Sequence, residues 1–264
     1  MTREQLMVKY KLNVDTLTYN GIIDAIPKHW RACMTKYSAE NEPKDKSDDE
    51  VYIADRRVKI STLSNQMLYW HLLDRIIKPP TALSKWMEEF PFLNDQDFSN
   101  YFTLPYSITR DTKLQTFQYA ILNNILPCQA LLFRWGIAEN KSCLYCNMYD
   151  SLSHHLYECN EVNLFWKQLI KWVKNNLNAQ IPLSRVDVLF GIPQLNDSLI
   201  HCMNLLILLG KWFIHKCALN NKKLFLLEFL PQVKNHLATE EHIAHLNGKE
   251  EQFNEQWGLL NETL

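Results

Sequence analysis

Three cysteines and one histidine lie close together near the middle of the chain. Two of the cysteines form a Cys-x2-Cys turn, seven residues separate this turn from the histidine, and four more separate the histidine from the last cysteine. Zn²⁺ in structural sites takes four thiolate or imidazole ligands in a tetrahedron, and this spacing is typical of small zinc modules. Because four protein ligands leave no position for water, the pattern predicts a structural metal and not a catalytic one. The candidate ligands are Cys143, Cys146, His154 and Cys159.

The histidine ligand is ambiguous, because His154 and His155 are adjacent. His155 precedes Cys159 by four residues and His154 precedes it by five, so helical spacing alone slightly favours His155. Other interpretations stay open: free cysteines and a histidine in a reduced core or, less favoured, a disulfide. A Cys/His hydrolase that uses Cys159 with either histidine is a third, but that chemistry needs an ionised, unliganded thiol and an orienting acid.

Further histidine and cysteine pairs occur at residues 201–202 and 215–217. Both pairs fall on an apolar helical pattern, where such side chains more often belong to the core. A second metal ion bound there is the alternative. The acidic run at residues 48–50 lies in a polar segment and is typical of a solvated linker.

The composition indicates a packed, helical, intracellular protein. The 264 residues are 47% hydrophobic and include 12 Phe, 11 Tyr and 8 Trp, but only six Gly, which favours helices. Seven cysteines and an amino terminus without an apolar signal core indicate a reducing compartment, cytoplasmic or nuclear. The longest apolar run, residues 205–214, is interrupted by Lys211 and is shorter than the ~20 residues of a membrane span. We therefore expect a soluble protein with no membrane partner.

Apolar residues recur at helical spacing along most of the chain, which predicts a mainly α, bundle-like fold with the small Cys-Cys-His-Cys zinc module inserted. Helices are expected within residues 1–37, 61–77, 81–89, 95–102, 111–126, 162–173, 184–190, 199–219 and 224–260. The apolar stripes of the helices between residues 61 and 126 are expected to be core faces. The expected domains are accessory helices and a polar linker (1–50), a helical domain (51–135), the zinc module with the following helix (136–176) and a C-terminal helical region (177–264).

Charge is unevenly spread along the chain. Residues 104–223 carry 12 Lys and Arg against 7 Asp and Glu, whereas residues 224–264 carry 2 against 7. A local basic excess around a zinc module favours nucleic-acid binding, and three tyrosines at positions 145, 149 and 157 offer stacking faces. We expect RNA or single-stranded DNA as the partner. The helical spacing of residues 167, 171 and 174 places three of the lysines on one helix face. The candidate nucleic-acid-binding residues are Lys141, Lys167, Lys171, Lys174, Arg110, Lys113 and Arg134.

Residues 108–166 resemble the carboxy-terminal region of LINE-type non-LTR retrotransposon reverse transcriptases, the reverse transcriptase zinc-binding domain family. In that family a helix leads through a Leu-Pro step and a Gly segment into a Cys, Cys, His, Cys module, closely followed by a Phe-Trp pair. The matching segments here are 112–115 (TKLQ), 126–127 (LP), 136–137 (GI) and 165–166 (FW), with similar later and earlier pieces at 187–191, 210–214 and 25–30. The resemblance favours His154 over His155 as the ligand.

The resemblance implies a region that holds template RNA or target DNA, with a reverse transcriptase polymerase domain as a further partner. The aromatic-x-Asp-Asp motif of those polymerases does not occur here, and a helical sequence leaves no room for their endonuclease. We therefore expect a non-catalytic, truncated copy or remnant of such a protein. The alternative, from a different class, is a protein-interaction scaffold in which zinc only stabilises a helical domain.

Overall fold

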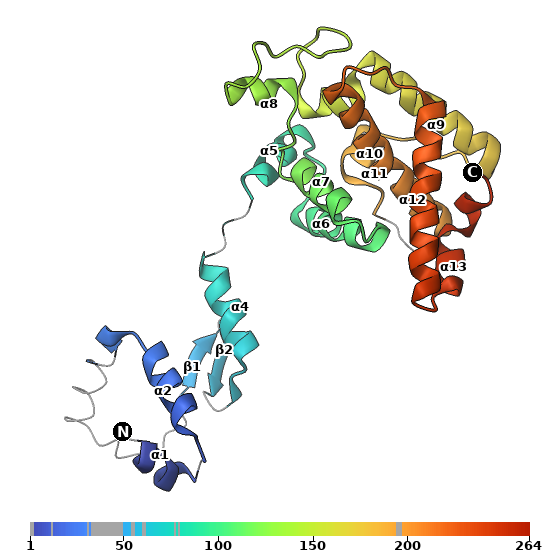
Figure 1. Cartoon of the computed structure of the whole chain (residues 1–264). Coiled ribbons are helices and arrows are strands. Elements are labelled where there is room, and N and C mark those ends of the chain that lie inside the picture. The colour runs from blue at the N-terminus through green and yellow to red at the C-terminus, as the bar shows by residue number, and fades with distance from the viewer. Residues whose placement is uncertain are drawn as a thin grey trace. The chain divides into compact units, whose positions relative to one another are not determined.

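This computed structural model describes residues 3–11, 13–30, 32, 50–53, 56–59, 62–76, 78, 80–193 and 197–264. The chain divides into two compact units, Met1–Lys78 and Pro79–Leu264 (Figure 1). The expected linker lies outside the described residues except for its last residue, Glu50. Helices dominate both units, which confirms the mainly α fold class.

The described residues of the first unit include the helices α1, α2 and α4 and a two-stranded hairpin. Asp15 caps the second helix by accepting a hydrogen bond from the Thr18 backbone N–H at 2.9 Å. Strands β1 and β2 pair antiparallel with Glu50 opposite Lys59. The sequence analysis missed this hairpin, because strands of four residues are too short to give a clear alternating pattern. The elements are α1 (Arg3–Tyr10), α2 (Thr16–Ala25), β1 (Glu50–Ile53), β2 (Arg56–Lys59) and α4 (Asn65–Ile76).

The apolar stripe of α4 is exposed, although the sequence pattern predicted a core face. Met67, Leu68, Leu72 and Ile76 all lie at the surface. Ile53 is the only buried hydrophobic side chain among the described residues of this unit. The prediction was wrong because amphipathic spacing shows that a helix has an apolar face, but not that another element covers it.

The second unit is a bundle of helices around one hydrophobic core. This core extends from Ala82 to Leu260 and includes Cys143, Leu156 and Cys159 of the metal module, while Cys128, Ala130 and Leu131 form a small separate cluster. The parts of the expected domains that lie after residue 78 thus contribute to one core. The elements are α5 (Thr81–Glu89), α6 (Asp95–Ile108), α7 (Thr112–Leu122), α8 (Gln129–Arg134), η2 (His154–Glu158), α9 (Asn160–Leu177), α10 (Arg185–Phe190), α11 (Ser198–Leu219), α12 (Leu226–Leu246) and α13 (Glu250–Asn261).

Helix α11 is the centre of the bundle and contacts α6, α7, α10, α12, α13 and η2. Within the described part of the chain it is the one helix long and apolar enough to cross a membrane. Of its most apolar window, 78% is buried inside the fold, as is typical of a core helix. Burial among other helices therefore accounts for its apolar character, whereas its 22-residue length alone would not distinguish it from a membrane span.

Local sequence signals mark the start of α6 and both ends of α10. Asn94 and Asp97 form a capping box at the start of α6, and Ser184 and Asp187 form another at the start of α10. Gly191 ends α10 with φ +96°, a conformation that favours glycine. Of these two helices, α10 packs against η2, whereas α6 packs against α7 and α11.

Candidate metal centre

The first two candidate ligands lie in a tight hairpin turn. Ser142 and Tyr149 form a bridge, and the Cys143 backbone N–H donates to the Met148 carbonyl at 2.7 Å. The turn closes through Asn147, whose φ of +61° is a left-handed conformation that Asn tolerates. The Tyr145 backbone N–H also points to Cys143 Sγ at 3.4 Å. Backbone geometry therefore brings the sulfurs of Cys143 and Cys146 to one side of the turn.

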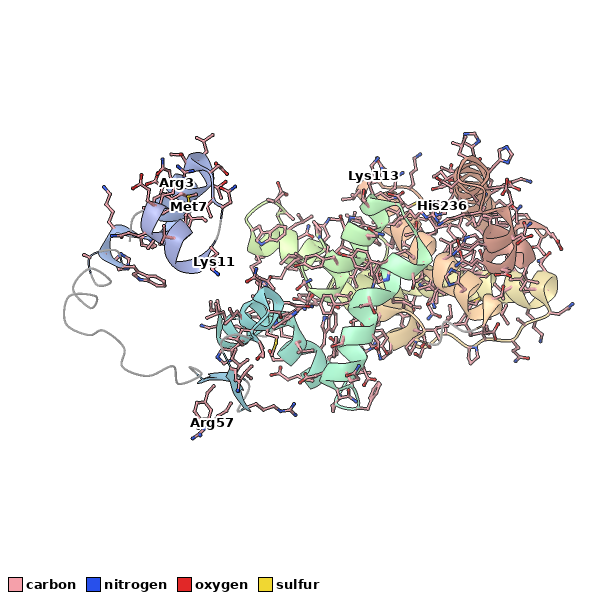
Figure 2. All side chains as sticks on the ribbon, turned by 90° about the horizontal axis from the view of Figure 1, so that it is seen from below. Arg3, Met7, Lys11, Arg57, Lys113 and His236 are labelled. Carbon is pink, nitrogen blue, oxygen red and sulfur yellow. The ribbon has the colours of Figure 1, made fainter. Side chains whose placement is uncertain are left out.

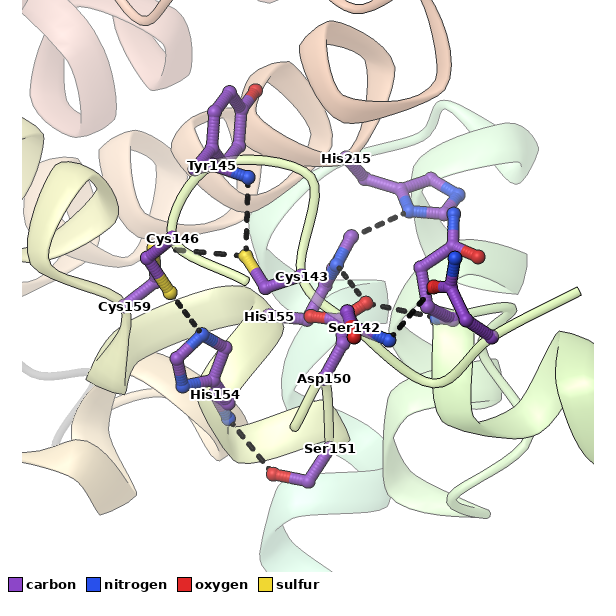
Figure 3. Close-up of polar contacts among 12 residues, drawn as sticks. Ser142, Cys143, Tyr145, Cys146, Asp150, Ser151, His154, His155, Cys159 and His215 are labelled. Carbon is purple, nitrogen blue, oxygen red and sulfur yellow. Dashed lines mark hydrogen bonds and ion pairs between the residues drawn. The ribbon is translucent and has the colours of Figure 1, made fainter. Parts of the chain in front are cut away.

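The other two candidate ligands flank a π-helical turn, η2. Its backbone bond runs from the Cys159 N–H to the His154 carbonyl at 3.1 Å, which spans five residues where an α-helix spans four. Because of this extra residue, His154 and Cys159 face the same side (Figure 3). The α-helical spacing that favoured His155 does not apply to a π turn.

The four candidate ligand atoms surround a space whose size fits a metal ion. All of them lie within 4.8 Å of one another. Cys143 Sγ and Cys159 Sγ are 3.8 Å apart, and Cys146 Sγ is 3.2 Å from His154 Nε2. A tetrahedron with metal–sulfur bonds of about 2.3 Å has sulfur–sulfur edges of about 3.8 Å and sulfur–nitrogen edges of about 3.6 Å. The cluster can therefore hold a metal ion with little rearrangement.

The sulfurs of the cluster interact electrostatically. A hydrogen bond from the Cys143 thiol to Cys159 raises the pKa of Cys143, and burial raises it further. The same hydrogen bond lowers the pKa of Cys159, which accepts it. A divalent cation bound by both sulfurs must displace the shared proton.

His155 points away from the cluster and joins the metal module to the central helix. Its Nδ1 lies 3.3 Å from Asp150 Oδ2, and its Nε2 lies 3.1 Å from His215 Nδ1 on α11 (Figure 3). Asp150 Oδ2 also accepts the Gln129 backbone N–H at 2.8 Å. Burial and the neighbouring His155 lower the pKa of His215 to about 4. The Asp150–His155–His215 chain was not foreseen, because only the fold brings residues 60 positions apart together.

The remaining histidine and cysteine pairs belong to the core. The His201 ring lies 4.4 Å from the Trp257 ring, and Cys202 and Cys217 are buried. Among the residues that the structure describes, no second group of His, Cys, Asp and Glu is close enough to hold a metal ion. This supports the core interpretation of these pairs.

Two of the candidate basic residues, Arg134 and Lys141, lie next to exposed aromatic residues near the cysteine turn. Arg134 ends α8, and Lys141 Nζ lies 4.9 Å from the centroid of the Phe133 ring. Phe133 is 41% exposed, Trp135 51% and Tyr149 58%. The sequence analysis named Tyr149 but missed Phe133 and Trp135, although aromatic residues directly flanking Arg134 were the available signal. We call these five residues the aromatic–basic face.

The other two tyrosines near the metal are used in packing. The Tyr145 hydroxyl donates to the Lys222 carbonyl at 3.0 Å, and the Tyr157 hydroxyl donates to the Leu183 carbonyl at 3.2 Å. Both rings are partly buried against the core. Of the three tyrosines expected to offer stacking faces, Tyr149 is therefore the most accessible.

Three candidate lysines form a row on α9. Lys167, Lys171 and Lys174 are all exposed, and they follow one another at spacings of four and three residues. The opposite side of the helix is buried in the core, including Trp166 and Leu169. The expected shared face of these lysines is therefore present on the solvent side of α9.

The last two candidates, Arg110 and Lys113, lie at the corner between α6 and α7. Arg110 lines a cavity of about 320 Å³ together with Glu240 and Lys249. Lys113 is exposed in the first turn of α7 (Figure 2). The seven candidate residues thus come from three places in the second unit: the surroundings of the cysteine turn, α9 and this corner.

No model of a known protein family matches the chain, and no curated protein matches it. The resemblance to LINE-type reverse transcriptases stays a prediction, carried by the motifs of residues 108–166. Chemically, four ligand atoms around one point can close the coordination shell of a tetrahedral ion, which suits a folding role.

Proposed function

We propose that this protein is a non-catalytic helical protein that binds one structural Zn²⁺ and holds single-stranded RNA or DNA. The convergence of three cysteine sulfurs and one imidazole nitrogen within 4.8 Å carries the proposal. Thiolate and imidazole ligands in a tetrahedron favour Zn²⁺ over Mg²⁺ or Ca²⁺, which prefer oxygen. On the basis of the resemblance, we further propose that the chain corresponds to the carboxy-terminal part of a retrotransposon reverse transcriptase. It would then be a truncated copy or remnant of such a protein, with a polymerase domain as a partner.

The nucleic-acid part of the proposal is supported by the aromatic–basic face. Single strands bind to proteins through cations that contact phosphates and through aromatic rings on which bases stack. Phe133, Trp135 and Tyr149 supply exposed rings, and Arg134 and Lys141 supply the cations beside them. The lysine row on α9 adds a second basic surface.

The first test is zinc content together with binding of a single-stranded RNA at two salt concentrations. We expect one zinc per chain and an affinity that falls steeply as salt rises. Arg134→Glu with Lys141→Glu should weaken binding and reduce the slope of log affinity against log salt by about 1.4, since two phosphate contacts are lost. The matched control is Lys223→Glu with Lys234→Glu, which makes the same charge change on exposed sites in other parts of the unit.

Separate outcomes contradict the two parts of this proposal. A protein purified without bound metal, and unable to bind added Zn²⁺, would overturn the metal site. Equal loss of affinity in the paired variant and its control would show that only overall charge matters. The lysine row is tested in the same way by replacing Lys167, Lys171 and Lys174 together with Glu, which should weaken binding while the fold is kept.

One observation favours the alternative, a protein-interaction scaffold. Ile137 is 70% exposed, Leu144 51% and Met148 64%, so apolar side chains also surround the cysteine turn. Exposed apolar groups of this kind mark protein contact sites when they are contiguous. A zinc-loaded protein that binds no strand at low salt would favour the scaffold, and Leu144→Asp with Met148→Asp would then be the variant that disrupts partner binding.

A further inference from the structure

A cavity of about 620 Å³ lies beside the metal module, between the π turn, the first half of α9 and the segment that follows α9. It is lined by side chains from all three segments and has both apolar and polar members. The lining residues used below are Tyr157, Asn163, Trp166, Lys167, Gln180 and Pro182.

The apolar walls of this cavity are held in place by hydrogen bonds. The Trp166 indole N–H donates to the Leu156 carbonyl at 2.8 Å, and the Tyr157 hydroxyl donates to the Leu183 carbonyl at 3.2 Å. Asn178, with φ +50°, turns the chain at the end of α9 so that residues 180–183 return to the cavity. Because its hydroxyl is already paired, the half-buried Tyr157 can contribute apolar surface to the cavity, whereas Trp166, only 1% exposed, supports the wall without offering surface of its own.

The polar lining consists of two carboxamides and one ammonium group. Asn163 is half-buried, Gln180 is exposed, and Lys167 begins the lysine row on α9. A carboxamide offers both donors and an acceptor, which suits the edge of a nucleobase, while apolar and aromatic walls suit its faces. An ammonium group at the same cavity suits the phosphate that accompanies the base.

We propose that this cavity binds one unpaired nucleobase of a single strand, whose phosphates continue along Lys167, Lys171 and Lys174. The inference rests on the proposed function and specifies where a base of the held strand is bound. Neighbouring lysines of the row are about one helical turn, or about 5–6 Å, apart, so successive phosphates can follow the helix. The specificity expected of such a site is for unstacked bases of single strands, since a paired base presents no free edge.

The test compares two strands of equal length and charge, a single-stranded RNA and the same backbone with abasic sites throughout. Asn163→Ala with Gln180→Ala removes the carboxamides of the cavity. Gln168→Ala with Asn175→Ala removes two exposed carboxamides of α9 outside it and serves as the control. Zinc content and far-ultraviolet circular dichroism verify that both variants keep the fold.

The cavity variant should bind the normal RNA about tenfold more weakly, a loss within the range reported for single base contacts, and should bind the abasic strand as the unaltered protein does. The control should change neither affinity. If the cavity variant keeps the full difference between the two strands, the base site is overturned, while the proposed strand binding stands. If the unaltered protein binds neither strand, both the base site and the proposed function are overturned.

Discussion

At the scale of single residues, one backbone hydrogen bond determines which histidine faces the sulfurs. The bond from the Cys159 N–H to the His154 carbonyl makes the turn π-helical. His154 is thereby brought to Cys146, while His155 is turned to Asp150 and His215. The two neighbouring imidazoles therefore have different roles, one as a candidate ligand and one as a support of the module.

This difference predicts unequal effects of two substitutions. His154→Ala should remove zinc from the purified protein and unfold the module from about Cys143 to Trp166, because metal affinity and local folding are the same free energy. His155→Gln should keep one zinc per chain, because His155 contacts Asp150 and His215 and none of the four candidate ligands. Any loss of zinc affinity should be much smaller than that of His154→Ala. Competition with a chelator measures both. A zinc-loaded His154→Ala protein would exclude His154 from the site, and Cys143→Ser, which should also lose zinc, is the positive control.

A buried lysine on α11 makes stability depend on pH. Lys211 Nζ donates to Gln118 Oε1 at 2.5 Å and to the Leu189 carbonyl at 3.0 Å, and burial lowers its pKa from 10.5 to about 7. Between about pH 7 and 10.5 the folded state holds this lysine neutral while the unfolded state protonates it. Since the unfolded state binds more protons there, the contribution of Lys211 to the free energy of unfolding rises with pH.

Lys211→Met should therefore change the pH dependence of unfolding. Relative to this variant, the unaltered protein should gain stability as pH rises from about 7 to 10.5, with no such gain below pH 7, where both states carry the proton. Urea unfolding at several pH values gives the free energy of unfolding of both proteins. The effects of other titrating groups are common to both and cancel when one value is subtracted from the other. A difference that is independent of pH would contradict the lowered pKa of Lys211.

At the scale of elements, a glycine of α11 accommodates a tryptophan ring of α9 that is bonded to the π turn. A Cβ atom added at Gly210 of α11 would lie 2.7 Å from Cη2 of Trp166, which is buried on α9 and bonded to the Leu156 carbonyl of the π turn. The indole ring is rigid and cannot yield without moving α9 or η2. The small residue at position 210 therefore leaves room for the Trp166 ring against α11.

Gly210→Ala should destabilise the protein by up to about 2 kcal/mol. Overpacking costs about 1–3 kcal/mol, and the better helix propensity of alanine offsets about 1 kcal/mol of it. Gly258→Ala is the matched control, since Gly258 is also helical but a Cβ there meets nothing within 4 Å. The control should be neutral or stabilising, and urea midpoints measure both. Equal effects of the two substitutions would show that the contact with Trp166 is unimportant.

Element positions were predicted well where caps or prolines mark the ends. The expected bounds of α5, Thr81–Glu89, are confirmed, and α10 begins after Ser184 and ends before Gly191 as its cap residues indicate. Helix α6 was expected to end near residue 102 but continues through Pro105 to Ile108, because its packed side chains outweigh the local cost of a proline. The π turn had no residue signature, so helical spacing alone pointed to His155. Only the family resemblance favoured His154, which is the histidine that lies with the three cysteines.

At the scale of the whole molecule, the two units differ in how they bury apolar residues. The core of the second unit is formed entirely by residues from Ala82 onwards. In the first unit, the described part of the chain leaves the apolar face of α4 exposed. Periodicity predicted both faces equally well, but the presence of a covering element depends on tertiary contacts that a single pattern does not contain.

We predict that residues 79–264 fold without the first unit. The isolated segment should bind one zinc per chain and unfold in one cooperative transition, with a free energy of unfolding within about 1 kcal/mol of the corresponding transition in the full chain, since no core residue is removed. Chemical denaturation followed by tryptophan fluorescence measures this. A segment that is aggregated or binds no zinc would show that the first unit supplies contacts needed for folding.

The hydrogen bonds that join Asp150, His155 and His215 hold the module in one of two helical registers. If the π turn lost its extra residue and became α-helical, His155 would move towards the sulfurs at the spacing of one ordinary helical turn from Cys159. The hydrogen bonds of His155 to Asp150 and His215 oppose this slip, because it would leave a buried carboxylate and a buried imidazole without their partner. Tertiary contacts on the far side of the turn thus oppose a change of register. Through them, the central helix helps to determine which of the two histidines faces the three sulfurs.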